Sequence, residues 1–128
     1  MSEPNTILVI EDQDDLRLLI RLTVKHLGRV VTAADPVGAM QMVAQERPDL
    51  VVLDVWLGSE MCGLDICRRL KGDPETRHVK VLLLSACGQQ SDVEAGLAAG
   101  ADRYVVKPFS PEVLVRTATE LLAERTAL

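Results

Sequence analysis

Leu50-Val51-Val52-Leu53-Asp54 is the stretch that decides the fold, because branched apolar residues run without interruption into a carboxylate. Other short apolar runs share this pattern, and polar residues follow each of them. These are residues 6–10 before Glu11 and Asp12, residues 81–84 before Ser85, and residues 104–106 before Lys107. Such runs are typical of strands buried on both faces in a parallel sheet covered by helices. Ligands bind outside the carboxyl ends of such strands, so the pattern also predicts a site.

Segments with helical spacing separate these runs. The starts and ends of the expected helices are marked by capping residues, prolines and glycines: Asp14 or Asp15 with Gly28, Asp35 and Pro36 with Pro48, Gly63 with Gly72, Gly100, and Ser110 with Pro111. We expect a weaker strand at residues 29–33 and a short helix at 63–70. The helix before Gly100 has the thinnest apolar stripe, formed by Val93, Leu97 and Ala98, so we expect it to be the most mobile.

This alternation predicts an α/β fold, a doubly wound parallel sheet of five strands in the order 2-1-3-4-5 with five helices. In that order the first and third strands are neighbours. Glu11 and Asp12 are therefore expected to converge on Asp54. A chain of 128 residues suits one domain with one core.

Composition excludes several classes of protein. The net charge of -5 disfavours direct nucleic acid binding, which requires clustered Lys and Arg. The 3 cysteines have no C-x-x-C spacing, which argues against a disulfide framework or a zinc site and favours a reducing, cytoplasmic location. No apolar run approaches the ~18 residues of a membrane span, and no secretory signal is visible.

The acidic residues favour a cation. Carboxylates brought together repel one another, and Mg²⁺ prefers oxygen ligands from one or two carboxylates together with water or phosphate. Taken singly, Glu11 and Asp12 could merely cap a helix. Their coincidence with Asp54 favours a metal site instead.

The same set predicts phosphoryl transfer. Asp54 follows a buried strand and is placed to act as a carboxylate nucleophile. Mg²⁺ and Lys107 can neutralise charge, while the Ser85 hydroxyl can donate to a phosphoryl oxygen. Alone, Lys107 would be interpreted as an exposed lysine and Ser85 as a hydroxyl at a strand end.

The motifs resemble the receiver domain of two-component response regulators. The resemblance rests on Ile10-Glu11-Asp12, the strand ending at Asp54, Ser85-Ala86, residues 99–102 and residues 104–108, and it covers essentially the whole chain. It implies a flavodoxin-like fold and phosphorylation of Asp54 by a phosphohistidine on a partner histidine kinase or phosphotransfer protein. It also implies Mg²⁺, with Mn²⁺ as a substitute, bound by Asp12, Asp54 and the Trp56 backbone carbonyl, with Glu11 assisting through water. His26 and His78 are then expected at the surface and not as phosphodonors.

The resemblance also implies a switch. Ser85 and Ala86 would bind the phosphoryl group, Tyr104 would swing inward, and the face made by the fourth helix, fifth strand and fifth helix would change. That face is expected to serve a downstream protein target, an output domain or a homodimer. The Lys107–Pro108 bond is expected to be cis. We expect residues 1–128 to be a single receiver domain, with no output domain in this chain and no enzymatic activity beyond its own phosphorylation and dephosphorylation.

Two features depart from the family pattern. Gly58 stands where the family usually has Pro, and Gly63 comes one residue late, so the loop Gly58 to Cys62 is expected to be longer. Trp56 could tune dephosphorylation or simply cover the surface. The main alternative function is a phosphorylation-independent interaction module with a receiver fold, which retention of the acidic and basic set disfavours. A hydrolase with an aspartyl nucleophile would need a cap domain, for which 128 residues leave little room.

Overall fold

The computed structural model describes residues 5–55, 62–86 and 90–126. Strands and helices alternate along these segments, with one 3-10 turn, η1 (Lys25–Leu27), after the first helix. The elements are β1 (Thr6–Ile10), α1 (Asp14–Val24), β2 (Arg29–Ala33), α2 (Pro36–Glu46), β3 (Leu50–Asp54), α3 (Cys62–Gly72), β4 (Lys80–Ala86), α4 (Gln90–Ala98), β5 (Arg103–Lys107) and α5 (Pro111–Thr126). Among the described residues, no helix is both long and apolar enough to cross a membrane.

The sheet confirms the predicted topology. All neighbouring strands are parallel, and their order is β2-β1-β3-β4-β5. This is the flavodoxin-like doubly wound arrangement, in which β1 and β3 lie together where the winding direction changes. Ile10 is paired with Leu53, so Glu11 and Asp54 leave the sheet at the same edge. Ala86 and Lys107 are paired at that edge as well.

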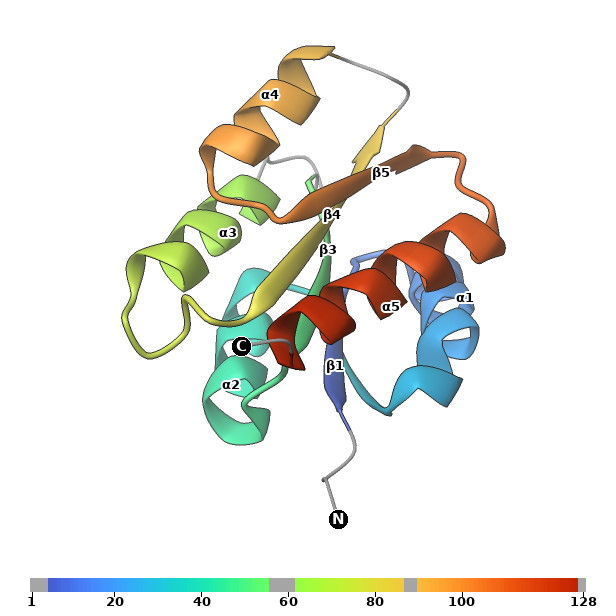
Figure 1. Ribbon diagram of the computed structural model, residues 1–128, viewed down its shortest axis with the longest axis horizontal. Helices are drawn as coiled ribbons and strands as arrows, with labels where there is room; N and C mark the ends of the chain where they lie inside the picture. Colours follow the sequence, from blue (N-terminus) through green and yellow to red (C-terminus); the bar gives the residue numbers. More distant parts are fainter. Residues whose placement is uncertain (1–4, 56–61, 87–89, 127–128) are drawn as a thin grey trace.

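Helices cover both faces of the sheet, as Figure 1 shows. Alternate strand residues point to opposite sides, which is why each buried strand contributes to two apolar clusters. Leu8, Val51 and Leu83 pack on the side of α2, α3 and α4. Ile7 and Leu82 pack on the opposite side, against α1 and α5. The core is therefore divided by the sheet into two layers.

Helix starts were only partly predictable. Asp35 caps α2, because its Oδ1 accepts a hydrogen bond from the Gly38 amide at 2.7 Å, and Ser110 Oγ accepts one from Val113 at 3.2 Å. The prediction that Asp14 or Asp15 caps α1 was wrong. Gln13 occupies the cap position without a side-chain cap bond, and both aspartates lie in the first turn. There they face the positive end of the helix dipole.

Two helical predictions need correction. α3 is not short: it has 11 residues, as many as α1 and α2. Its last turn is held by Lys71, whose Nζ donates to the Val79 carbonyl at 2.7 Å. On α4, Leu97 is half exposed and faces away from the core, whereas Gly96 is buried. A Cβ at Gly96 would lie 2.6 Å from Leu83, so this glycine lets α4 approach the sheet closely.

Cys67 is a free, buried thiol on α3. Burial raises its pKa to about 11, and Sγ donates to the Ala99 carbonyl at 3.5 Å. The thiol is therefore protonated at neutral pH and unreactive. The side chains of Cys62 and Cys87 lie outside the described residues. His26 and His78 are exposed, as predicted.

Gly63 packs directly against the strand that ends in Asp54. Its amide donates to the Val55 carbonyl at 3.1 Å, and a Cβ there would lie 2.0 Å from the Asp54 carbonyl oxygen. Only a residue without a side chain fits this approach. The glycine that departs from the family spacing thus has a defined packing role.

Gly63→Ala is expected to lower the free energy of unfolding by about 3 kcal/mol, because the backbone of β3 must shift to admit the methyl group. Gly72→Ala on the same helix is the matched control. Nothing lies within 4 Å of the added methyl group at Gly72, so this change should leave stability within about 1 kcal/mol or raise it. Denaturant unfolding of both variants measures the difference. Equal stabilities would contradict the packing role of Gly63.

Candidate functional site

The candidate site lies at the carboxyl edge of the sheet. Glu11 and Asp12 follow β1, Asp54 ends β3 and Lys107 ends β5. The first and last of these positions are far apart in the chain and meet only because the strands are parallel. Glu11 and Asp54 are the buried charged residues of the described chain, with 1% and 4% of their surface exposed.

One ammonium group joins the two buried carboxylates. Lys107 Nζ donates a hydrogen bond to Asp54 Oδ2 and lies 3.6 Å from Glu11 Oε1. An ion pair shielded from water is a strong restraint on geometry, since loss of either partner leaves a buried charge uncompensated. The pair therefore fixes the direction of the Asp54 carboxylate.

Glu11 has an unusual environment for a carboxyl group. Burial raises its pKa to about 8, with further contributions from Asp12 and Asp54, while the Lys107 ammonium acts in the opposite direction. Its Oε2 accepts a hydrogen bond from the Asp12 amide at 2.8 Å. Its Oε1 is buried and accepts no hydrogen bond from the described residues. This oxygen is one that a cation or a water could satisfy.

These residues fit a hard divalent cation. The donor set consists of carboxylate oxygens, and one of them lacks a hydrogen-bond partner in the described structure. Within the described segments, no group of three or more His, Cys, Asp or Glu side chains forms a complete metal site, and Asp12 is exposed. Mg²⁺ usually retains several waters and needs only one or two carboxylates, so the donor set remains suitable.

The other predicted residues surround this edge. Ser85 and Ala86 end β4, opposite Val106 and Lys107 in the sheet, although their side chains are outside the described structure. Tyr104 is paired with Leu83 and is 42% exposed. The Lys107–Pro108 peptide bond is cis. Trp56 and the loop from Gly58 lie outside the described residues, so their predicted roles stay predictions.

Sequence reasoning missed Arg17. This residue lies on the first turns of α1, and its Nη1 donates to the Glu11 carbonyl at 3.0 Å. Nη2 bonds to Asp14 Oδ1 at 2.5 Å. A basic residue three positions after an acidic one on a helix predicts the contact of Arg17 with Asp14. The same spacing does not predict the contact with the Glu11 carbonyl. The contact with the loop depends on how α1 turns back over the end of β1.

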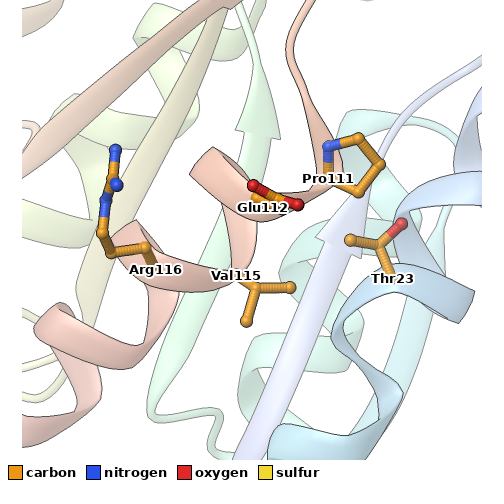
Figure 2. A pocket seen from close by; sticks show the side chains of 5 residues that line it. All are labelled: Thr23, Pro111, Glu112, Val115 and Arg116. Carbon is orange, nitrogen blue, oxygen red and sulfur yellow. The ribbon is translucent and has the colours of Figure 1, made fainter.

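Exposed apolar side chains on α1 and a cavity between α1 and α5 lie outside the carboxylate site. Leu18, Leu19 and Leu22 on α1 are each about half exposed. The cavity has a volume of about 410 Å³. Figure 2 shows Thr23 of α1 facing a group of α5 residues that line it. These α5 residues are Pro111, Glu112, Val115 and Arg116. The cavity is lined by the first turns of α5 and by Thr23 near the end of α1.

Comparison with known proteins gives a consistent result. Residues 7–119 match the family model described as the response regulator receiver domain. The chain is 41% identical over 112 residues to the phosphate regulon transcriptional regulatory protein PhoB of Rhizobium meliloti, covering 86% of this chain and 49% of that protein. The chain thus spans about half the length of the curated relatives it matches first.

Solved structures agree with the sequence comparison. A putative response regulator from Chloroflexus aurantiacus has a TM-score of 0.88 and 34% identity, covering 94% of this chain and 99% of the other. The BeF3-activated DrrB receiver domain has a TM-score of 0.80 and 33% identity, covering 92% and 97%. The family match over residues 7–119 includes the site residues described above.

Lys107→Met is expected to lower the free energy of unfolding of the metal-free protein by about 3 kcal/mol, because Asp54 and Glu11 lose their shared counter-ion. In an Asp54→Asn background the same change should have a clearly smaller effect. Denaturant unfolding of the two single variants and the double variant gives the coupling energy directly. Additive effects would show that the buried pair contributes no interaction of its own.

Proposed function

Because this chain belongs to the receiver domains of response regulators, the switches of two-component signal transduction, we propose that Asp54 accepts a phosphoryl group from a phosphohistidine. The donor would be a partner histidine kinase or a histidine phosphotransfer protein. The observation that carries this proposal is the buried Asp54 carboxylate, bonded to Lys107 at the carboxyl edge of the sheet. Its position directly after a buried strand, held by Lys107, supports a role as a nucleophile.

Each residue of the site has a separate role in the proposed phosphoryl transfer. An Asp54 carboxylate oxygen attacks phosphorus, a new O–P bond forms as the P–N bond to the donor histidine breaks, and the leaving imidazole takes up a proton. Lys107 holds Asp54 in place and would also neutralise a phosphoryl oxygen. The Ser85 hydroxyl, at the end of β4, would donate to another phosphoryl oxygen. Such transfer depends on alignment and charge neutralisation more than on proton chemistry.

A bound divalent cation would complete this arrangement. Asp12, Asp54 and the Trp56 backbone carbonyl would bind Mg²⁺, or Mn²⁺ in its place, with Glu11 assisting through water. Such an ion would neutralise negative charge on the phosphoryl oxygens. The buried Glu11 Oε1, without a hydrogen-bond partner among the described residues, supports this assignment.

A protein that donates the phosphoryl group to Asp54 must contact a surface of this chain. The half-exposed leucines of α1 and the cavity in Figure 2 provide an apolar one. Exposed apolar patches of this kind mark protein–protein contacts. We infer that the phosphodonor contacts the α1/α5 surface, because α1 begins just after Asp12 and α5 just after the loop that follows Lys107.

The signal would leave through a different face, formed by α4, β5 and α5. In the structure, Tyr104 on β5 points to solvent with 42% of its surface exposed, and Leu97 on α4 is 50% exposed. Phosphorylation would draw Ser85 and Ala86 toward Asp54, and Tyr104 would move inward behind them. This population shift would alter the surface that a downstream target, an output domain or a second copy contacts.

The proposal describes a switch and not a catalyst for other substrates. Its intrinsic reactions would be its own phosphorylation and dephosphorylation, with the cysteine pattern favouring a cytoplasmic location. A receiver-like module that works without phosphorylation would keep the fold without needing the Asp54–Lys107 pair. The retained pair, the buried Glu11 and the adjoining Asp12 favour the phosphoacceptor.

Incubation with acetyl phosphate and Mg²⁺, followed by a mildly acidic quench, should add one phosphoryl group to the protein, as measured by intact mass. Asp54→Ala should abolish the adduct. Asp49→Asn is a matched control: Asp49 Oδ2 accepts from the Thr6 amide at 2.9 Å, at the opposite edge of the sheet, so this variant should keep the adduct. No adduct on the parent protein, together with no Mg²⁺ binding, would favour the phosphorylation-independent module.

Activation by Mg²⁺ and beryllofluoride, a phosphoryl mimic, should bury the Tyr104 ring. The chain has a single Tyr, so one labelled ring signal in NMR reports its exposure to a soluble paramagnetic probe. We expect the paramagnetic relaxation of this signal to fall by at least about half, given the present exposure of 42%. In Asp54→Ala the signal should not respond. An equally exposed ring with and without beryllofluoride would rule out the inward movement.

A further inference from the structure

We propose that Arg17 is a positioning residue for the carboxylate site, through a hydrogen bond that fixes the segment carrying Glu11 and Asp12. This inference rests on the proposed function, because it concerns the Mg²⁺ affinity of the same site. Arg17 is not expected to contact the phosphoryl group or the ion. It acts through the backbone of Glu11.

The guanidinium of Arg17 connects two parts of the loop that joins β1 to α1. Its Nη1 donates to the Glu11 carbonyl oxygen at 3.0 Å, before the helix, and its Nη2 pairs with Asp14 Oδ1 at 2.5 Å, in the first turn. Because the guanidinium is planar and rigid, the two contacts set its orientation together. The Arg17 side chain is 21% exposed, so the contact with Glu11 is largely shielded from water.

Contacts with two neighbouring elements, β2 and α1, hold the segment between β1 and α1. Gln13 occupies the cap position of α1 without a side-chain cap bond. The Glu11 amide donates to the Ala33 carbonyl of β2 at 3.1 Å, which fixes one side of the residue. Arg17 fixes the other side through the carbonyl. Restraint at both peptide groups determines where the Glu11 carboxylate and the following Asp12 lie.

Attraction between charges does not by itself explain the contacts of Arg17 with Glu11 and Asp14. The pair with Asp14 is exposed, with 86% of the Asp14 side chain accessible, and exposed pairs contribute little to stability. A positive charge near a cation site opposes the binding of Mg²⁺. By charge alone, removal of Arg17 should therefore tighten Mg²⁺ binding. If Arg17 positions the ligands, its removal should weaken binding, so the two explanations predict opposite signs.

The test is a calorimetric Mg²⁺ titration of the parent protein, Arg17→Met, Arg17→Lys and Arg21→Met. Arg17→Met keeps most of the aliphatic stem but removes the donors, and we expect roughly tenfold weaker Mg²⁺ binding, as for other residues that orient metal ligands. Arg17→Lys keeps one donor group, so its Mg²⁺ affinity should lie between those of the parent protein and Arg17→Met. Arg21, exposed one turn further along α1, is the matched control for loss of one positive charge from the same helix. The Arg21→Met variant should bind Mg²⁺ as tightly as the parent protein or slightly more tightly.

Two further readouts separate positioning from a general effect on folding. Thermal unfolding without Mg²⁺ should give nearly the same midpoint for Arg17→Met and the parent. Phosphorylation of Arg17→Met by acetyl phosphate should be slow at limiting Mg²⁺ and recover at saturating Mg²⁺.

Unchanged or tighter Mg²⁺ binding in both Arg17 variants would overturn the positioning role while leaving the proposed function intact. A parent protein that neither binds Mg²⁺ nor takes up a phosphoryl group would overturn the proposed function and this role with it.

Discussion

The parallel pairing of the strands is the constraint on which the rest of the structure depends. Because β1, β3, β4 and β5 run in one direction, the residues that follow them all emerge at one edge. An antiparallel arrangement would place half of these residues at the opposite edge. Parallel pairing also requires crossover helices, which cover both faces and exclude water from the strands. The same constraint therefore builds the core and assembles the site.

Burial of charge at that edge gives the site its chemical character. Two carboxylates, Glu11 and Asp54, are removed from water with one ammonium group, Lys107, between them. Burial is the main reason why the pKa of Glu11 is raised to about 8, the neighbouring Asp12 and Asp54 raise it further, and the Lys107 ammonium acts in the opposite direction. Two buried carboxyl groups, one of them with an oxygen that has no hydrogen-bond partner among the described residues, suit a hard cation as ligands. A bound cation would in turn allow a phosphoryl group to approach three carboxylates.

Positions outside the motifs decide how accurately this edge is built. Gly63 allows α3 to lie against the end of β3, and Gly96 allows α4 to approach Leu83 of β4. Arg17 bonds to the Glu11 carbonyl from the first turns of α1. None of these contacts follows from residue spacing along the chain. They depend on the distance and rotation of each helix relative to the sheet, which are set by packing of side chains from several elements.

The sequence alone determined the strands, their order, the caps at Asp35 and Ser110 and the placement of Glu11, Asp12, Asp54 and Lys107 at one edge of the sheet, because uninterrupted apolar runs and capping residues act locally or through a fixed topology. It misplaced the start of α1, the length of α3 and the inward face of α4. Only the tertiary structure decided the burial of Glu11, the bond between Lys107 and Asp54 and the contact of Arg17 with the loop. These features arise where separate elements meet, and the free energy of burying a charge depends on every group around it.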